Sequence, residues 1–144
     1  MDKVKQSVSC YKEGFNCSQA VFSTFAVEMG MDRNTALKVS QGFGGGMGGM
    51  GKTCGAVTGA FMVIGLKYGR TRVDDDEAKL KTYALVQEFT KRFKARHGTI
   101  VCRELLGCDI GTPEGHRIAK EKKLVSTLCP RFVQDAAEII EEIL

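Results

Sequence analysis

Residues 42–59 read GFGGGMGGMGKTCGAVTG, and this stretch decides how the rest of the chain can fold. Its first ten residues, 42–51, include seven glycines. Glycine costs about 1 kcal/mol relative to alanine at each interior helix position, so residues 42–51 are expected to form a loop. From Thr53, which is expected to act as the cap, apolar residues recur every three or four positions to about Tyr68. This spacing predicts a helix directly after the loop.

Helical periodicity extends on both sides of the loop. Upstream, helices are expected up to Gly14, from the cap Asn16 to Gly30, and over about residues 34–41 with Asp32 as the cap. Downstream, they are expected from Asp74 to Gly98, from Thr99 to Gly107, from Thr112 and Pro113 onward, and from near Pro130 to the C-terminus. No segment shows the two-residue alternation of a strand. The sequence therefore predicts one all-α domain over residues 1–144, a compact bundle of about five to seven helices with a glycine-rich loop.

Length and composition agree with a single globular domain. The chain has 144 residues, of which 43% are hydrophobic and 26% charged. The longest apolar run, Ala60–Leu66, is shorter than the roughly 18 residues of a membrane span, so no membrane partner is expected. Residues 1–6 are charged and lack the apolar core of a secretory signal. We therefore expect a cytoplasmic location.

The net charge of +4 does not by itself indicate a nucleic-acid partner. The basic residues are spread over several segments and are interrupted by acidic residues at 74–77 and again at 138, 141 and 142. Nucleic-acid binding domains gather their basic residues on one face. We expect no nucleic-acid binding.

Two nucleotide-binding patterns match inside the glycine loop. Residues 46–53 satisfy the pattern GxxxxGK followed by Ser or Thr, and Gly44, Gly46 and Gly49 satisfy GxGxxG. Both patterns require a hydrophobic strand that leads into the loop and positions the phosphates. Residues 37–41 have helical character instead. The matches are therefore attributed to the glycine content of the loop.

The six cysteines lie at positions 10, 17, 54, 102, 108 and 129, and no two of them form a CxxC pair. This spacing excludes a thioredoxin motif, c-type haem attachment and the common zinc-finger pattern. His97 and His116 lie in basic helix-end or loop contexts and are expected at the surface. Cys10 and Cys108 are expected to act as small apolar residues.

The other four cysteines, Cys17, Cys54, Cys102 and Cys129, each lie at or near a predicted helix terminus, on four different helices. A bundle could bring these four termini to one end. Cys54 directly follows the predicted cap Thr53, where the helix dipole favours a thiolate. Cys54 is therefore expected to be the most acidic thiol.

These residues together resemble a known family. The matching segments are NCSQA at 16–20, the glycine loop at 42–48, CGAVTG at 54–59, CRELLG at 102–107, and Cys129 with the residues Val133, Ala136, Ala137 and Glu138 that follow it. The chain resembles the bacterial and archaeal family of redox-active proteins named C_GCAxxG_C_C, over nearly its whole length. The resemblance implies a redox role for the four signature cysteines, whereas Cys10, Cys108 and Lys52 lie outside the signature.

Three hypotheses for the four cysteines remain open at this point. In the first, they hold an iron-sulfur cluster, most simply 2Fe-2S, for electron transfer or sensing. Backbone N–H groups near the sulfurs would then come from Gly44, Gly45, Gly46, Gly48 and Gly55. In the second, the same cysteines cycle between dithiol and disulfide as a thiol-disulfide oxidoreductase, with Cys54 as the better nucleophile. In the third, they form a structural zinc site or belong to a non-catalytic helical scaffold.

The hypotheses differ in what they require. The residues leave open whether the protein is an enzyme, and they do not identify the redox partner protein. A homo-oligomer is compatible with all three.

Overall fold

A computed structural model describes residues 2–144, and within that range the chain forms eight α-helices and no strand. The helices are α1 (Lys3–Lys12), α2 (Cys17–Glu28), α3 (Arg33–Gln41), α4 (Gly55–Tyr68), α5 (Asp76–His97), α6 (Cys102–Leu106), α7 (Pro113–Glu121) and α8 (Leu124–Ile143). The all-α prediction is confirmed. The helix count exceeds the predicted five to seven, and the eight helices correspond to the eight helical segments expected from the periodicity.

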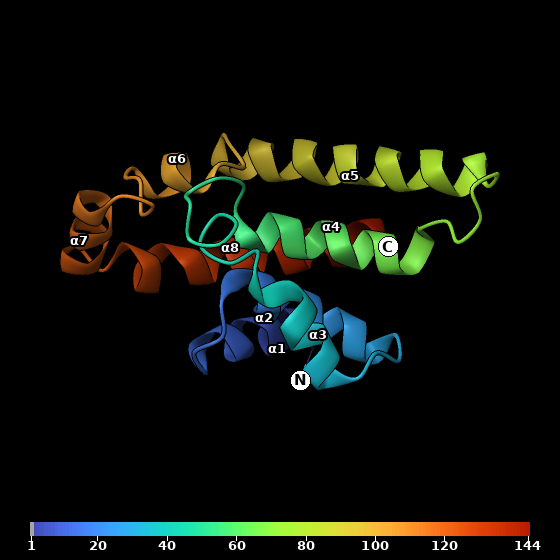
Figure 1. Ribbon diagram of the computed structural model, residues 1–144, viewed down its shortest axis with the longest axis horizontal. Helices are drawn as coiled ribbons and strands as arrows, with labels where there is room; N and C mark the ends of the chain where they lie inside the picture. The colour runs from blue at the N-terminus through green and yellow to red at the C-terminus, as the bar shows by residue number, and fades with distance from the viewer. Residues whose placement is uncertain (1) are drawn as a thin grey trace.

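The helices form three layers, with α4 and α8 in the middle (Figure 1). The long helix α5 covers one side of this pair, and α1, α2 and α3 pack on the other. The glycine loop, α6 and α7 lie toward one end of the molecule, and the turn between α4 and α5 lies at the opposite end (Figure 1). No helix within residues 2–144 combines the length and hydrophobicity needed to cross a bilayer.

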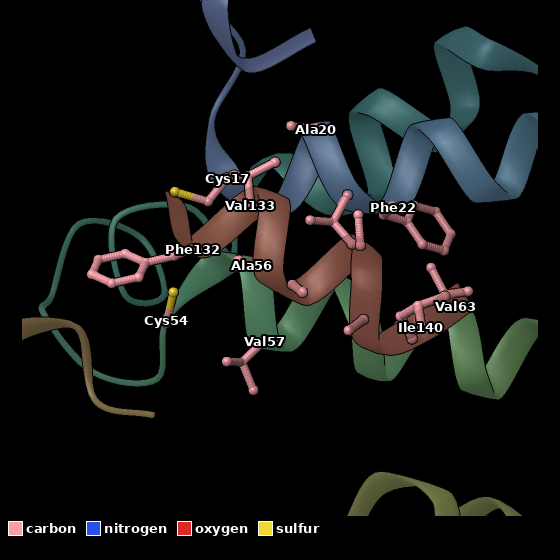
Figure 2. Close-up of a cluster of buried hydrophobic side chains, with 14 of the residues drawn as sticks. Cys17, Ala20, Phe22, Cys54, Ala56, Val57, Val63, Phe132, Val133 and Ile140 are labelled. Carbon is pink, nitrogen blue, oxygen red and sulfur yellow. The ribbon is translucent and has the colours of Figure 1, made fainter. Parts of the chain in front are cut away.

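Small side chains let the two central helices approach their neighbours closely. Ala56 and Ala60 of α4 and Ala136 and Ala137 of α8 are fully buried. Figure 2 shows how side chains of α2, α4 and α8 meet in this core. The closest approach is at Gly59, where an added Cβ would lie 2.9 Å from the carbonyl oxygen of Ser18 in α2. The crossing of α2 and α4 therefore depends on glycine.

Several predicted helix starts are confirmed. The Asn16 side chain accepts from the Gln19 amide at 2.9 Å, and the Gln19 side chain accepts from the Asn16 amide at 3.1 Å, which is a capping box. Asp32 caps α3 through the Thr35 amide, and Thr112 caps α7 through the Gly115 amide. Each of these side chains satisfies a backbone N–H that has no partner inside the helix.

Other predicted boundaries are wrong. Cys54, not Thr53, is the N-cap of α4, because Thr53 is drawn into an isolated antiparallel bridge with Val101. Asp75, one residue after the predicted Asp74, caps α5 by accepting from the Ala78 amide at 3.1 Å. Val101 rather than Thr99 is the N-cap of α6.

The start of the last helix is also earlier than predicted. Helix α8 begins at Leu124, so Pro130 and Cys129 lie inside it and not at its terminus. A proline within a helix leaves the carbonyl four residues earlier without its bond, here that of Ser126. Ser126 and Pro130 both line an open hollow at the surface.

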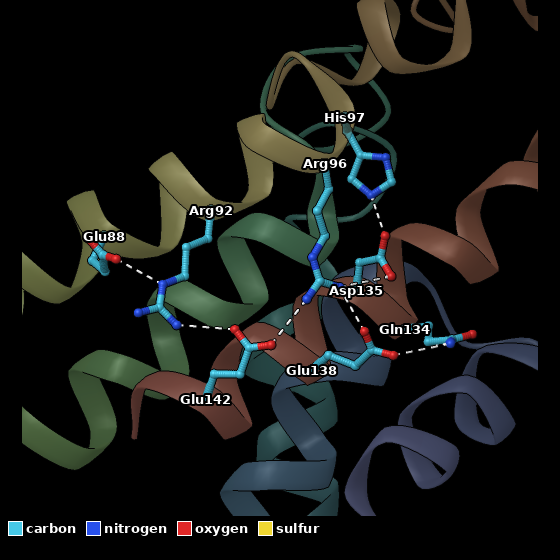
Figure 3. A network of polar contacts seen from close by, with 8 residues as sticks. All are labelled: Glu88, Arg92, Arg96, His97, Gln134, Asp135, Glu138 and Glu142. Atoms are coloured by element: carbon cyan, nitrogen blue, oxygen red, sulfur yellow. Dashed lines mark hydrogen bonds and ion pairs between the residues drawn. The ribbon is translucent and has the colours of Figure 1, made fainter.

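A polar network fastens α5 to α8 (Figure 3). Arg96 of α5 contacts Glu138 of α8 at 2.7 Å, and His97 contacts Asp135 at the same distance. The His97 side chain is only 14% exposed and packs against Phe132, with ring centroids 5.0 Å apart. The expectation of a surface position is therefore wrong for His97, because its hydrogen bond to Asp135 and its ring packing shield most of the side chain. His116 is exposed, as predicted.

We predict that Gly59→Ala lowers the free energy of unfolding by about 1 to 3 kcal/mol, because the new methyl group would press against the Ser18 backbone. The matched control is Gly65→Ala in the same helix, where an added Cβ meets nothing within 4 Å. That change is expected to raise stability by about 0.5 to 1 kcal/mol, since alanine is the better helix former. Urea unfolding of the two variants measures both effects. Equal stabilisation by both would contradict the close crossing.

Candidate functional site

One cavity of about 290 Å³ is lined by all four of the cysteines Cys17, Cys54, Cys102 and Cys129. Each of them is buried. They belong to the start of α2, the cap of α4, the start of α6 and the interior of α8. Since one water molecule takes about 30 Å³ of liquid, this space is far larger than an ordinary packing void. We call it the cysteine cavity.

Cys17 is positioned by the capping residue before it. Asn16 caps α2 and also donates from Nδ2 to the carbonyl oxygen of Gln41 at 3.0 Å. The entry to the glycine loop is thereby tied to the first turn of α2. Gly44 lies directly against the Asn16 side chain, which leaves no room for a Cβ. Figure 2 shows Cys17 and Cys54 at the same end of the core, near Phe132.

Cys54 and Cys102 are brought together by the isolated bridge. The Cys54 amide donates to the carbonyl oxygen of Ile100 at 2.8 Å, and the Cys102 amide donates to that of Lys52 at 2.5 Å. The two hydrogen bonds join segments that are far apart in the chain. The bridge therefore places two of the four cysteines side by side on the cavity wall.

The glycine loop closes the cavity by backbone contact. Gly46 has φ +70°, and an added Cβ would lie 2.7 Å from Cβ of Cys102. An added Cβ at Gly55 would lie 3.2 Å from Cβ of Cys17. Of the five glycines predicted to surround the sulfurs, Gly45, Gly46 and Gly55 line the cavity, whereas Gly44 and Gly48 lie outside its lining.

The cysteines are not arranged around a single ion. All six are free of disulfide bonds. Within residues 2–144, no three His, Cys, Asp or Glu side chains surround one common point as the ligands of one metal ion would. Cys10 lies apart from the cavity, 3.8 Å from the Ser23 hydroxyl, and Cys108 is half-buried outside it.

Comparison with known proteins identifies the family. The family model C_GCAxxG_C_C, described as "Putative redox-active protein", matches residues 15–143. The chain belongs to this family. The family name contains the pattern GCAxxG, whereas residues 54–59 of this chain read CGAVTG, with cysteine before glycine. No curated protein and no solved structure matches the chain.

In this family member, burial dominates the acidity of two of the four thiols. Burial raises the pKa of Cys54 to about 12, although the backbone amides of Ala56 and Val57 act in the opposite direction. Burial, with the nearby charge of Cys129, raises the pKa of Cys102 to about 11. The favourable position at a helix start is therefore outweighed by the loss of water.

The acidic thiol is Cys129. A hydrogen bond from the Cys17 thiol lowers the pKa of Cys129, and the Tyr11 hydroxyl adds to this effect. The same bond, followed by burial, raises the pKa of Cys17 well above its ordinary value. Cys129 is therefore the first of the four to ionise. The expectation that Cys54 is the most acidic thiol is wrong, because desolvation at Cys54 exceeds the effect of the helix dipole.

Tyr11 is the site residue that sequence reasoning missed. It lies on the apolar stripe of α1, three residues after Val8 and seven after Val4, a spacing typical of a core position. Its hydroxyl faces Cys129 and donates to the carbonyl oxygen of Val125 at 3.3 Å. The one signal in the sequence was a hydroxyl on an otherwise apolar stripe, since a buried tyrosine hydroxyl needs a partner.

In the reduced, metal-free protein, we predict that Cys129 shows the lowest apparent pKa of the four cavity thiols. Tyr11→Phe is expected to raise that pKa, because it removes a group that stabilises the thiolate. Alkylation against pH, followed for each cysteine by mass spectrometry, gives the four values. Measuring apparent pKa instead of absolute rate removes the effect of restricted access. A lower pKa at Cys54 than at Cys129 would contradict the geometry described above.

Proposed function

We propose that the cysteine cavity is the redox centre of this protein and that its four cysteines together hold an iron-sulfur cluster, most simply 2Fe-2S. The observation that supports this proposal most strongly is that four buried thiols from four helices line one cavity. Four cysteine thiolates are the usual ligand set of a 2Fe-2S cluster. When bound, such a cluster supplies one-electron chemistry for electron transfer or sensing.

The size of the cavity favours a cluster over a single zinc ion. Four thiolates around one zinc each need a distance of about 2.3 Å from the same centre. The described cysteines do not surround one such point, and about 290 Å³ lies between the cavity walls. An inert scaffold would fill this volume with side chains, because protein interiors are close-packed.

The electrostatics of the cavity also favour a bound cation. Burial and the nearby cysteines raise the pKa values of Cys54 and Cys102. Metal cations compensate the charge of thiolates that would otherwise stay protonated when buried. Cys17 and Cys54 lie at the starts of α2 and α4, where the partial positive charge of the helix further stabilises thiolate ligands.

Thiol-disulfide exchange is the second candidate, and the position of Cys17 next to Cys129 on the cavity wall favours it. In that reaction the Cys129 thiolate attacks an external disulfide, forms a mixed disulfide and releases one thiolate. Cys17 then loses its proton and attacks the Cys129 sulfur. The second external thiol leaves, and the Cys17–Cys129 disulfide remains. The two electrons and two protons of the dithiol reduce the external disulfide to two thiols.

The cluster proposal predicts that protein purified without oxygen contains about two iron and two sulfide per chain and absorbs visible light. Serine at position 17, 54, 102 or 129 is expected to reduce the loading, because ligands of one centre act together. Cys10→Ser and Cys108→Ser are the controls and should keep full loading, since neither lines the cavity. Iron, sulfide and zinc analysis with absorption spectra measures this. Protein without iron, or with one zinc lost on cysteine substitution, would refute the cluster.

The exchange candidate predicts one specific disulfide. Treatment of the metal-free protein with oxidised glutathione is expected to join Cys17 to Cys129, because the Cys129 thiolate lies beside the Cys17 thiol. Peptide mapping by mass spectrometry identifies the bond. Cys54→Ser serves as the matched control and should leave this bond intact. A product with random pairing, or one that joins Cys10 to Cys108, would count against dithiol chemistry at this site.

A further inference from the structure

A second and larger hollow lies next to the cysteine cavity. It has a volume of about 820 Å³ and is lined by residues of α1, the turn after it, α7 and the start of α8. These elements meet at the end of the molecule that also carries the glycine loop and α6 (Figure 1). Tyr11, Phe15, Ile110 and Val125 line both hollows, so the two lie side by side. We call the larger one the outer basin.

The outer basin carries positive charge that nothing nearby neutralises. Lys12, Lys120 and Lys123 line it and are exposed, and none of its described lining residues is Asp or Glu. None of the three lysines forms an ion pair within residues 2–144, whereas Glu13 and Glu121 pair with arginines, at 3.8 Å and 3.1 Å. The basin therefore attracts anions without local competition.

The shared wall of the basin is apolar. Phe15, Ile110 and Val125 form it, and Val125 is 39% exposed. The volume lies within the range of about 300 to 1,000 Å³ that small-molecule sites occupy. A basic rim beside an apolar wall complements a molecule that has an acid group and an apolar body.

We propose that the outer basin binds a small organic anion with an apolar or aromatic body. Its acid group lies among Lys12, Lys120 and Lys123, and its body lies against Phe15 and Val125, on the side of the basin that faces Tyr11. The binding does not depend on what the cysteine cavity holds. The basin lies beside the cysteine cavity at Tyr11, which lines both and lies next to the Cys129 thiol.

The test compares two fluorescent probes of similar shape, 1-anilinonaphthalene-8-sulfonate and its uncharged relative N-phenyl-1-naphthylamine. The sulfonate is expected to bind more tightly, and added salt should weaken the sulfonate alone, since salt screens exposed charges. Equal affinities for the uncharged probe and the sulfonate would overturn the proposal.

The double variant Lys12→Gln with Lys120→Gln is expected to weaken sulfonate binding by about five- to tenfold. Its matched control is Lys38→Gln with Lys91→Gln, which removes the same charge from exposed positions on α3 and α5 and should leave binding unchanged. Val125→Asp should weaken both probes, because it puts a carboxylate on the apolar wall. Circular dichroism confirms the fold of each variant. Equal loss in the two double variants would overturn the proposal.

A final arm links the basin to the cysteines. Bound sulfonate is expected to slow alkylation of Cys129 and to leave Cys10, on another face, unaffected. Displacement of the probe by poly-glutamate but not by naphthalene sulfonate would identify an acidic protein surface as the occupant and overturn the proposal. All arms are run on iron-free and as-isolated protein. If the as-isolated protein contains no iron and still binds the sulfonate, the cluster proposal is refuted and the basin proposal is supported.

Discussion

The structure depends on one close contact, that of the α4 backbone with the first turn of α2. Gly55 and Gly59 make it, and side chains at these positions would press on Cys17 and Ser18. Because the two helices touch at this level, Cys17 and Cys54 share one end of the core (Figure 2). The glycine loop then turns back across the same end. Helix α8 packs against α4 and places Cys129 at this end as well. Removal of that contact would separate the walls of the cysteine cavity.

Two opposing electrostatic effects act on the thiols at this end. Helix starts favour thiolates at Cys17 and Cys54, and burial disfavours them. Burial is stronger at Cys54, while at Cys129 the effects of the neighbouring Cys17 thiol and Tyr11 hydroxyl prevail. The most acidic thiol is thus the one with donor side chains beside it, inside a helix and not at its start. Hydrogen bonding by neighbouring side chains, more than position along a helix, differentiates the four cysteines.

Local signals predicted most of the fold, and long-range contacts account for what they missed. The glycine run predicted the loop, and the caps Asn16, Asp32 and Thr112 were found because capping depends on residues three apart. Thr53 failed as a cap because it pairs with Val101, a contact that no local pattern encodes. The burial of His97 and the role of Tyr11 depend on α8, which lies far away in sequence. For the same reason, the order of thiol acidity could not be read from spacing.

The bridge between Thr53 and Val101 has a consequence for how the chain tolerates change. Helices α4 and α5 form a hairpin that the bridge fastens at its base, beside the cysteines, while the turn that joins them lies at the other end of the molecule (Figure 1). The bridge thus holds the two ends of the hairpin together independently of the turn. Residues 69–74, which end before the Asp75 cap of α5, can therefore differ in length or accept an inserted domain without altering the spacing of the sulfurs. A reporter fused there would lie at the end of the molecule opposite the cysteines, and the bridge would keep the starts of α4 and α6 in place.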